Sequence, residues 1–125
     1  MTIKVMLADD EENLVALMTA ILEGDPRYRL VVARNGLEAV ELARREKPAL
    51  LFLDVRMPGK DGLQVCRELK SNPETGCISI VMLTALAQSA DRERAQEVGA
   101  DDYITKPFSP SAILDKVEQV LSASG

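Results

Sequence analysis

The 125-residue sequence has no histidine, no tryptophan and only four aromatic side chains. Without histidine the chain cannot itself hold a Ser-His-Asp or Cys-His catalytic set, nor a zinc site built on imidazole. Because the net charge is −5 and aromatics are few, we expect no direct nucleic-acid binding, which needs basic patches and stacking platforms. Any chemistry of this chain must therefore use carboxylates, hydroxyls, amines or the backbone.

Long apolar runs and closely spaced cysteines are missing too. No apolar run approaches the roughly 18 residues of a membrane-spanning helix, so we expect no membrane segment. The acidic residues 9–12 follow the first apolar run too soon for a secretory leader. Cys66 and Cys77 form no C-x-x-C pair. These features predict a cytoplasmic protein in which both cysteines are small, buried, reduced side chains.

What the sequence does contain is a fivefold alternation of short apolar runs and helical patterns. The runs expected to be strands are residues 3–8, 29–33, 50–53, 78–83 and 102–105. The helical patterns that follow them lie at residues 14–22, 36–46, 63–69, 87–98 and, capped by Ser109, 110–121. The pattern predicts one α/β domain, a (βα)5 fold with a parallel sheet between two layers of helices. We place this domain at residues 1–122 and a frayed tail at 123–125.

The expected helix at residues 87–98 differs from the others because its apolar stripe is mostly alanine. A helix that buries little apolar surface docks weakly, so we expect motion here. An ordinary Ala-rich surface helix is the alternative interpretation.

Polar residues follow four of the five expected strands. They are Asp9 and Asp10, Asp54, Thr84 and Lys106. In a parallel α/β sheet ligands bind outside the carboxyl ends of the strands, so these side chains should converge. Three converging carboxylates repel one another unless a cation lies between them. An all-oxygen ligand set suits Mg²⁺ or Mn²⁺.

The same residues carry the groups of a phosphoryl-transfer site. Asp54 offers a carboxylate nucleophile, Thr84 a hydroxyl and Lys106 a positive charge. With a divalent cation, these groups predict transfer through an aspartyl phosphate. Each residue alone has a simpler interpretation, because Asp often caps a helix and Thr is common in strands. Their shared position at strand ends favours the functional interpretation.

At this level of detail the sequence resembles the CheY-like receiver domain of two-component response regulators, over residues 3–121. The motifs that carry the resemblance are Asp9-Asp10, D-x-R-M-P-G-x-D-G at 54–62, L-T-A at 83–85 and G-A-D-D-Y-I-T-K-P-F at 99–108. The resemblance implies the flavodoxin-like strand order 2-1-3-4-5 and a three-layer sandwich.

The resemblance also implies roles at the acidic edge. Asp54 would be the phosphoacceptor, taking a phosphoryl group from a phosphohistidine of a sensor histidine kinase or histidine phosphotransfer protein. Asp9, Asp10 and Asp54 would hold Mg²⁺ together with the backbone carbonyl of Arg56. The protein would be a signalling switch that catalyses its own phosphorylation and dephosphorylation, rather than a turnover enzyme.

Further implied roles concern the switch. Thr84 and Lys106 would contact the phosphoryl oxygens, and Thr84 and Tyr103 would be the switch residues. Phosphorylation would then alter the face made by the fourth helix, fifth strand and fifth helix, and so control an output domain or effector protein. The cis Lys–Pro bond usual in the family would fall at Lys106-Pro107.

The run at residues 99–110 resembles receivers that form homodimers through that face. The candidates for ion pairs across such a dimer are Arg92, Asp101, Asp102 and Lys116. Ala112 stands where those regulators usually have an acid, which removes one expected partner of Arg92. The simpler interpretation is a solvated charged face.

Other functions remain open from the sequence. A small haloacid-dehalogenase-type phosphatase also uses an aspartate nucleophile and Mg²⁺, but its nucleophile stands in D-x-D near the N-terminus, whereas Asp54 is followed by Val55-Arg56. A phosphorylation-independent interaction module on the same fold is a second alternative. An FMN carrier would need a Ser/Thr-rich loop where this chain has Asp9-Asp10.

Overall fold

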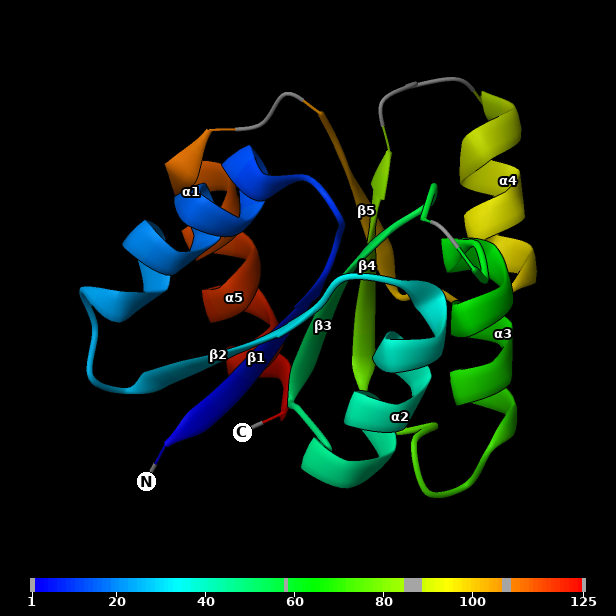
Figure 1. Cartoon of the computed structure of the whole chain (residues 1–125), viewed down its shortest axis with the longest axis horizontal. Helices are drawn as coiled ribbons and strands as arrows, with labels where there is room; N and C mark the ends of the chain where they lie inside the picture. The colour runs from blue at the N-terminus through cyan, green and yellow to red at the C-terminus, as the bar shows by residue number, and fades with distance from the viewer. Residues whose placement is uncertain (1, 58, 85–88, 107–108, 125) are drawn as a thin grey trace.

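The computed structural model describes residues 2–57, 59–84, 89–106 and 109–124. The strands are β1 (Ile3–Ala8), β2 (Tyr28–Ala33), β3 (Leu50–Asp54), β4 (Ser79–Thr84) and β5 (Asp102–Thr105). The helices are α1 (Glu12–Glu23), α2 (Gly36–Glu46), α3 (Gly62–Ser71), α4 (Ser89–Glu97) and α5 (Pro110–Ser124). Strands and helices alternate along the chain, as the sequence predicts (Figure 1). Within the described ranges, no helix has the length and hydropathy needed to cross a bilayer.

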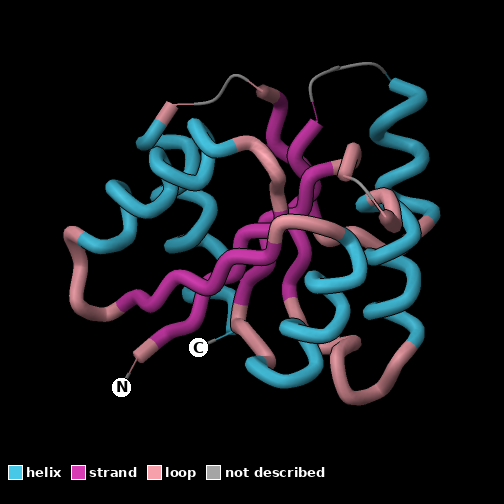
Figure 2. Tube along the Cα trace, viewed as in Figure 1, coloured by secondary structure: helices cyan, strands magenta, loops and turns pink. Residues whose placement is uncertain are grey.

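All five strands run parallel in the order β2-β1-β3-β4-β5, which confirms the expected topology. Helices α1 and α5 cover one face of the sheet, and α2, α3 and α4 cover the other (Figures 1 and 2). The fully apolar β3 serves both layers because successive side chains point to opposite faces. Leu50 and Phe52 pack with α1 and α5, and Leu51 and Leu53 pack toward α2 and α3.

The observed helices and strands lie close to their expected bounds. β2 begins at Tyr28, one residue early, and β4 ends at Thr84, one residue late. The Ser109 hydroxyl accepts a hydrogen bond from the Ala112 amide at 3.2 Å, which confirms the expected cap. α5 continues to Ser124, three residues beyond the expected helix.

One expectation about the cysteines is confirmed and the other is wrong. Cys66 is buried, with its Sγ 3.5 Å from the carbonyl oxygen of Val98. Cys77 is exposed. The inward position of the turn before β4 is taken by Thr75, whose hydroxyl donates to the Leu69 carbonyl at 2.7 Å. Cys77 is thereby left outside, although an apolar run follows it directly.

The described side chains of α4 are those of residues 93–97. Among its described side chains Ala95 is buried, and Val98 is buried just beyond the helix. In the following turn Asp101 pairs with Lys70 at 2.9 Å and accepts the Ile80 amide at 2.7 Å. Residues 87 and 88 and the side chains of residues 89–92 lie outside the described part of the chain, so the weak docking expected of residues 87–98 stays a prediction.

Candidate functional site

The parallel register brings the four polar strand ends to one edge of the sheet. Ala8 pairs with Leu53, so Asp9 and Asp54 follow neighbouring strands at the same level. On the other side of β3, Asp54 pairs with Leu83, the residue before Thr84. The Lys106 amide donates to the Thr84 carbonyl at 2.7 Å, which brings the end of β5 to the same edge.

The three expected acidic residues form one cluster. Carboxylate oxygens of Asp9, Asp10 and Asp54 lie within 4.8 Å of one another. Asp9 is fully buried, Asp10 is exposed and Asp54 lies between these extremes, with 13% of its side chain exposed. Oxygen ligands open to solvent on one side fit a hard divalent cation that keeps part of its water shell.

Asp10 does not have the structural role that its position before α1 allowed. The residue that precedes α1 is Glu11, and its side chain forms no capping hydrogen bond. The Glu11 amide instead donates to Asp9 Oδ1 at 2.8 Å, which orients the buried carboxylate. The position before α1 is thus taken by Glu11, and the metal-ligand role of Asp10 stays a prediction.

Lys106 is the cation of the cluster. Its Nζ lies 3.0 Å from Asp9, 3.5 Å from Asp54 and 3.8 Å from Glu11. Burial acts to lower the pKa of Lys106, but the hydrogen bond to Asp9 and the charges of Asp54 and Glu11 outweigh it, so the pKa is raised. Lys106 is therefore a fixed positive charge beside Asp54.

Asp54 has an unusual pKa for an aspartate. Burial first, and the charge of Asp9 second, raise its pKa from 3.8 to about 6, against the opposing effect of Lys106. The Arg56 amide donates to Asp54 Oδ1 at 3.2 Å, which also favours the charged form but does not compensate. A cation bound among the carboxylates would restore full ionisation.

Two glycines allow close backbone contacts with the loop after Asp54, a role that the residue pattern alone does not predict. A Cβ on Gly62 would lie 2.0 Å from the Asp54 carbonyl oxygen, and one on Gly36 would lie 2.2 Å from the Lys60 carbonyl oxygen. The Gly62 amide donates to the Val55 carbonyl at 2.8 Å. Both glycines open helices, so α2 and α3 begin in backbone contact with the segment around Asp54. In the sequence, the Asp61-Gly62 pair is the feature that could have indicated such a close approach.

Capping fixes where α3 begins. Asp61 Oδ1 accepts the Gln64 amide at 2.9 Å, and the Gln64 side chain accepts the Asp61 amide at 3.2 Å. This reciprocal capping box satisfies two amides of the first turn. The backbone from Asp54 to Gly62 is therefore held at both ends.

The expected switch residues lie on the adjacent strands β4 and β5, where Tyr103 pairs with Met82, two residues before Thr84. Thr84 is buried at the end of β4, and Tyr103 on β5 is partly buried. Tyr103 packs against the core layer that contains Ala95 and Val98, so it lies beside α4. Pro107 lies outside the described residues, and with it the expected cis bond.

Three of the four candidate dimer residues have partners within the chain. Asp101 pairs with Lys70, and Lys116 pairs with Asp102. The side chain of Arg92 lies outside the described residues. The homodimer remains a prediction from the sequence.

Comparison with known proteins agrees with this fold and shows the class of protein. The class is a signalling domain of the phosphoacceptor type, a parallel α/β sandwich. The response regulator receiver domain family matches residues 5–118, and the chain belongs to this family. It is 40% identical over 121 residues to the alkaline phosphatase synthesis transcriptional regulatory protein PhoP of Bacillus subtilis, covering 97% of this chain and 49% of PhoP.

Solved structures show the same relationship. A putative response regulator of Chloroflexus aurantiacus has a TM-score of 0.90 and 30% identity, covering 98% of this chain and 99% of its own. The receiver domain of a Pseudomonas aeruginosa sensor histidine kinase, with a magnesium ion in its active-site cleft, has a TM-score of 0.88 and 26% identity, covering 98% and 99%. The chain spans about half the length of the curated relatives that it matches.

Gly62→Ala should distort the backbone of residues 54–62. The added Cβ would overlap the Asp54 carbonyl oxygen, so we expect a loss of at least about 2 kcal/mol in the free energy of unfolding. Urea unfolding and the amide shift of Val55 measure both effects. Gly24→Ala is the control, because a Cβ there meets nothing closer than 4.0 Å. Equal stability of the two variants would contradict the close approach.

Asp54→Asn should stabilise the metal-free protein at neutral pH. Because folding raises the pKa of Asp54 from 3.8 to about 6, stability present below pH 3.8 is lost as the pH rises through 6. Asparagine mimics the protonated acid, so we expect the variant to gain on the order of 2–3 kcal/mol over the parent at about pH 8 and almost nothing at about pH 3. Urea unfolding in chelator measures this gain, with exposed Asp115→Asn as the control. A gain independent of pH would refute the assignment.

Proposed function

We propose that Asp54 is the phosphoacceptor of this receiver domain, with a phosphohistidine on a sensor histidine kinase or histidine phosphotransfer protein as the donor. The observation that carries the proposal is the unequal exposure of the three carboxylates. Asp9 is buried and hydrogen-bonded to Lys106, and Asp10 is exposed. Asp54 alone combines partial access with a position 3.5 Å from the Lys106 ammonium.

The transfer follows from this geometry. A carboxylate oxygen of Asp54 attacks phosphorus, an O–P bond forms, and the P–N bond to the donor imidazole breaks. The electron pair of that bond returns to the imidazole nitrogen, which takes a proton from solvent. Lys106 and the Thr84 hydroxyl offset charge on the phosphoryl oxygens. Hydrolysis of the acyl phosphate by water later returns Asp54 to its carboxylate, and the protein resets as a switch rather than turning over a substrate.

The metal ligands would be Asp9, Asp10, Asp54 and the backbone carbonyl of Arg56. The acidic cluster is the chain's own support for this set, and the magnesium-bound Pseudomonas relative supports the choice of ion over Mn²⁺. A divalent cation held there would offset charge on the phosphoryl group and favour the ionised form of Asp54. The chain's own part is to hold the Asp9 carboxylate buried and oriented and to place the Lys106 ammonium 3.5 Å from Asp54.

The output of the domain would follow from the position of Thr84 and Tyr103. Phosphorylated Asp54 would draw Thr84 toward the phosphoryl group, and Tyr103 would move into the space left beside α4. Of the described side chains of α4, residues 93–97, only Ala95 is buried, which supports a helix whose contacts rearrange at low cost. The altered α4–β5–α5 face would then control an output domain, an effector protein or a second copy of the domain. The cytoplasmic location expected from the sequence stays a prediction.

Acetyl phosphate with Mg²⁺ should phosphorylate Asp54. We expect intact-mass spectrometry to show one added phosphoryl group, which is lost in Asp54→Asn and after chelation of the metal. Lys106→Met should slow the transfer by at least about tenfold, because a charge beside the phosphoryl oxygens is removed. Asp61→Asn is the control acid in the same loop. Phosphorylation that persists in Asp54→Asn would contradict the assignment of Asp54. An absence of phosphorylation in the parent protein would favour the alternative of a phosphorylation-independent interaction module.

Hydrogen exchange tests the switch. With beryllofluoride and Mg²⁺ as a stand-in for the phosphoryl group, amide protection in residues 89–105 should change, while protection in β2, which carries no residue of the site, should not. Thr84→Ala should suppress the change without lowering metal affinity. Unchanged protection across residues 89–105 in the liganded parent protein would count against a switch built on α4 and Tyr103.

A further inference from the structure

The most exposed of the large apolar side chains among the described residues belongs to α2. Leu37, in the first turn of α2, is 63% exposed. The buried stripe of α2 consists of Gly36, Ala39, Val40 and Ala43, so Leu37 is one position off the stripe and faces outward. It stands over the loop that follows β3, where a Cβ on Gly59 would be 3.9 Å from its Cγ. An exposed leucine alone needs no explanation, but this one borders a groove.

The groove lies along the outer side of α2 and has a volume of about 530 Å³. We call it the α2 groove, and its lining residues are Leu37, Val40, Glu41, Arg44, Arg45 and Lys60. Leu37 and Val40 supply apolar surface and the rest supply charge. A surface that combines exposed apolar and charged side chains can bind another protein.

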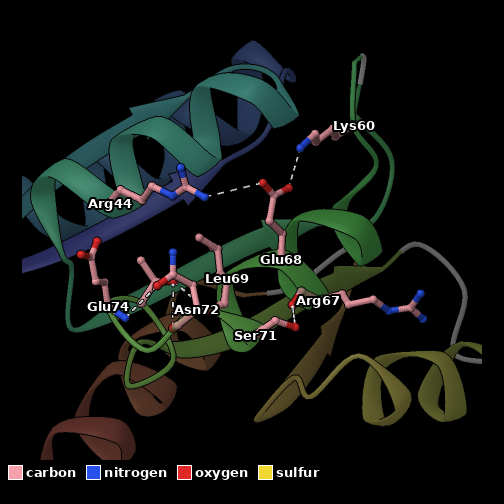
Figure 3. A network of polar contacts seen from close by, with 9 residues as sticks. Arg44, Lys60, Arg67, Glu68, Leu69, Ser71, Asn72 and Glu74 are labelled. Carbon is pink, nitrogen blue, oxygen red and sulfur yellow. Dashed lines mark hydrogen bonds and ion pairs between the residues drawn. The ribbon is translucent and has the colours of Figure 1, made fainter.

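Its charge is opposite in sign to that of the chain. Arg44 and Lys60 share one carboxylate, that of Glu68 on α3, which lies 3.8 Å from Arg44 (Figure 3). Two cations on one acid leave a net positive charge, and Arg45 adds a cation against the single acid Glu41. The groove is thus positive on a chain whose net charge is −5. Arg44 is 50% and Lys60 36% exposed, so both remain accessible to a partner.

From this complementarity we propose that the α2 groove docks an acidic segment of a partner protein that carries a bulky apolar side chain. The apolar side chain would cover Leu37 and Val40, and the carboxylates would meet Arg44, Arg45 and Lys60. An extended polyanion such as nucleic acid fits less well, because the positive region is short and the surrounding chain is acidic. The proposal does not depend on phosphorylation of Asp54.

The position of the groove gives the docking a consequence. Lys60 belongs to the loop between Asp54 and α3, and its backbone is in contact with Gly36 at the start of α2. A partner in the groove therefore touches the segment that leads from the acceptor. Helix α2 covers the face of the sheet opposite α1 and α5 (Figure 1). A partner in the groove therefore leaves the surfaces of α1 and α5 accessible.

The test uses the metal-free, unphosphorylated protein and a synthetic acidic peptide with a central Leu-Phe pair. In an ¹⁵N NMR titration we expect amide shifts at Leu37, Arg45 and Lys60. Leu37→Ser and Arg45→Glu should each weaken binding at least about fivefold, as expected for residues at the centre of an interface. Matched controls are Leu114→Ser, the other exposed leucine, and Arg29→Glu on β2, and both should bind as the parent does.

Several results would overturn the proposal. The first is no binding at millimolar peptide, and the second is binding that maps to residues 101–120 or survives both groove substitutions. Equal binding of a peptide with Ser-Ser in place of Leu-Phe, or of a single-stranded oligonucleotide, would show charge attraction without docking. Because the titration contains no phosphoryl donor or metal, each result stands apart from the phosphorylation experiment.

Discussion

The chemistry of the site depends on the repulsion among three carboxylates that the fold holds at one edge of the sheet. Their oxygens lie within 4.8 Å of one another, and one of them, that of Asp9, is fully buried. Lys106 offsets part of this charge, but the pKa of Asp54 is still raised to about 6. The cluster therefore favours binding of a cation. It is also sensitive to any covalent change at Asp54 that alters the charge there. This imbalance is the physical basis on which a switch can work.

The backbone around Asp54 is held in place by its neighbours. Gly62 and Gly36 allow α3 and α2 to begin in close contact with the segment from Asp54 to Gly62, and the capping box at Asp61 sets the start of α3. Helix α4 is different, because only Ala95 is buried among its described side chains, residues 93–97. In the proposed switch, a rigid site would act on a helix with few described buried contacts.

Much of the fold and site could be predicted because both rest on local patterns. Fully apolar β3 and β4 indicated buried parallel strands, and parallel strands end at a common edge, so Asp54, Thr84 and Lys106 had to converge. Long-range packing was less accessible. The exposure of Cys77 depends on Thr75 filling the turn, and the intrachain partners of Asp101 and Asp102 come from α3 and α5. Nothing local in the sequence encodes these contacts.

The sequence by itself determined the fold class and the convergence of the acidic residues and the lysine, because these follow from residue types and their spacing along strands. Only the tertiary structure decided which carboxylate is buried and which is accessible, and that Gly62 touches the Asp54 backbone. It also decided that α2 and the loop at Lys60 enclose a positive groove around Leu37. Burial and distance between segments remote in sequence arise from packing, so they exist only once the chain has folded.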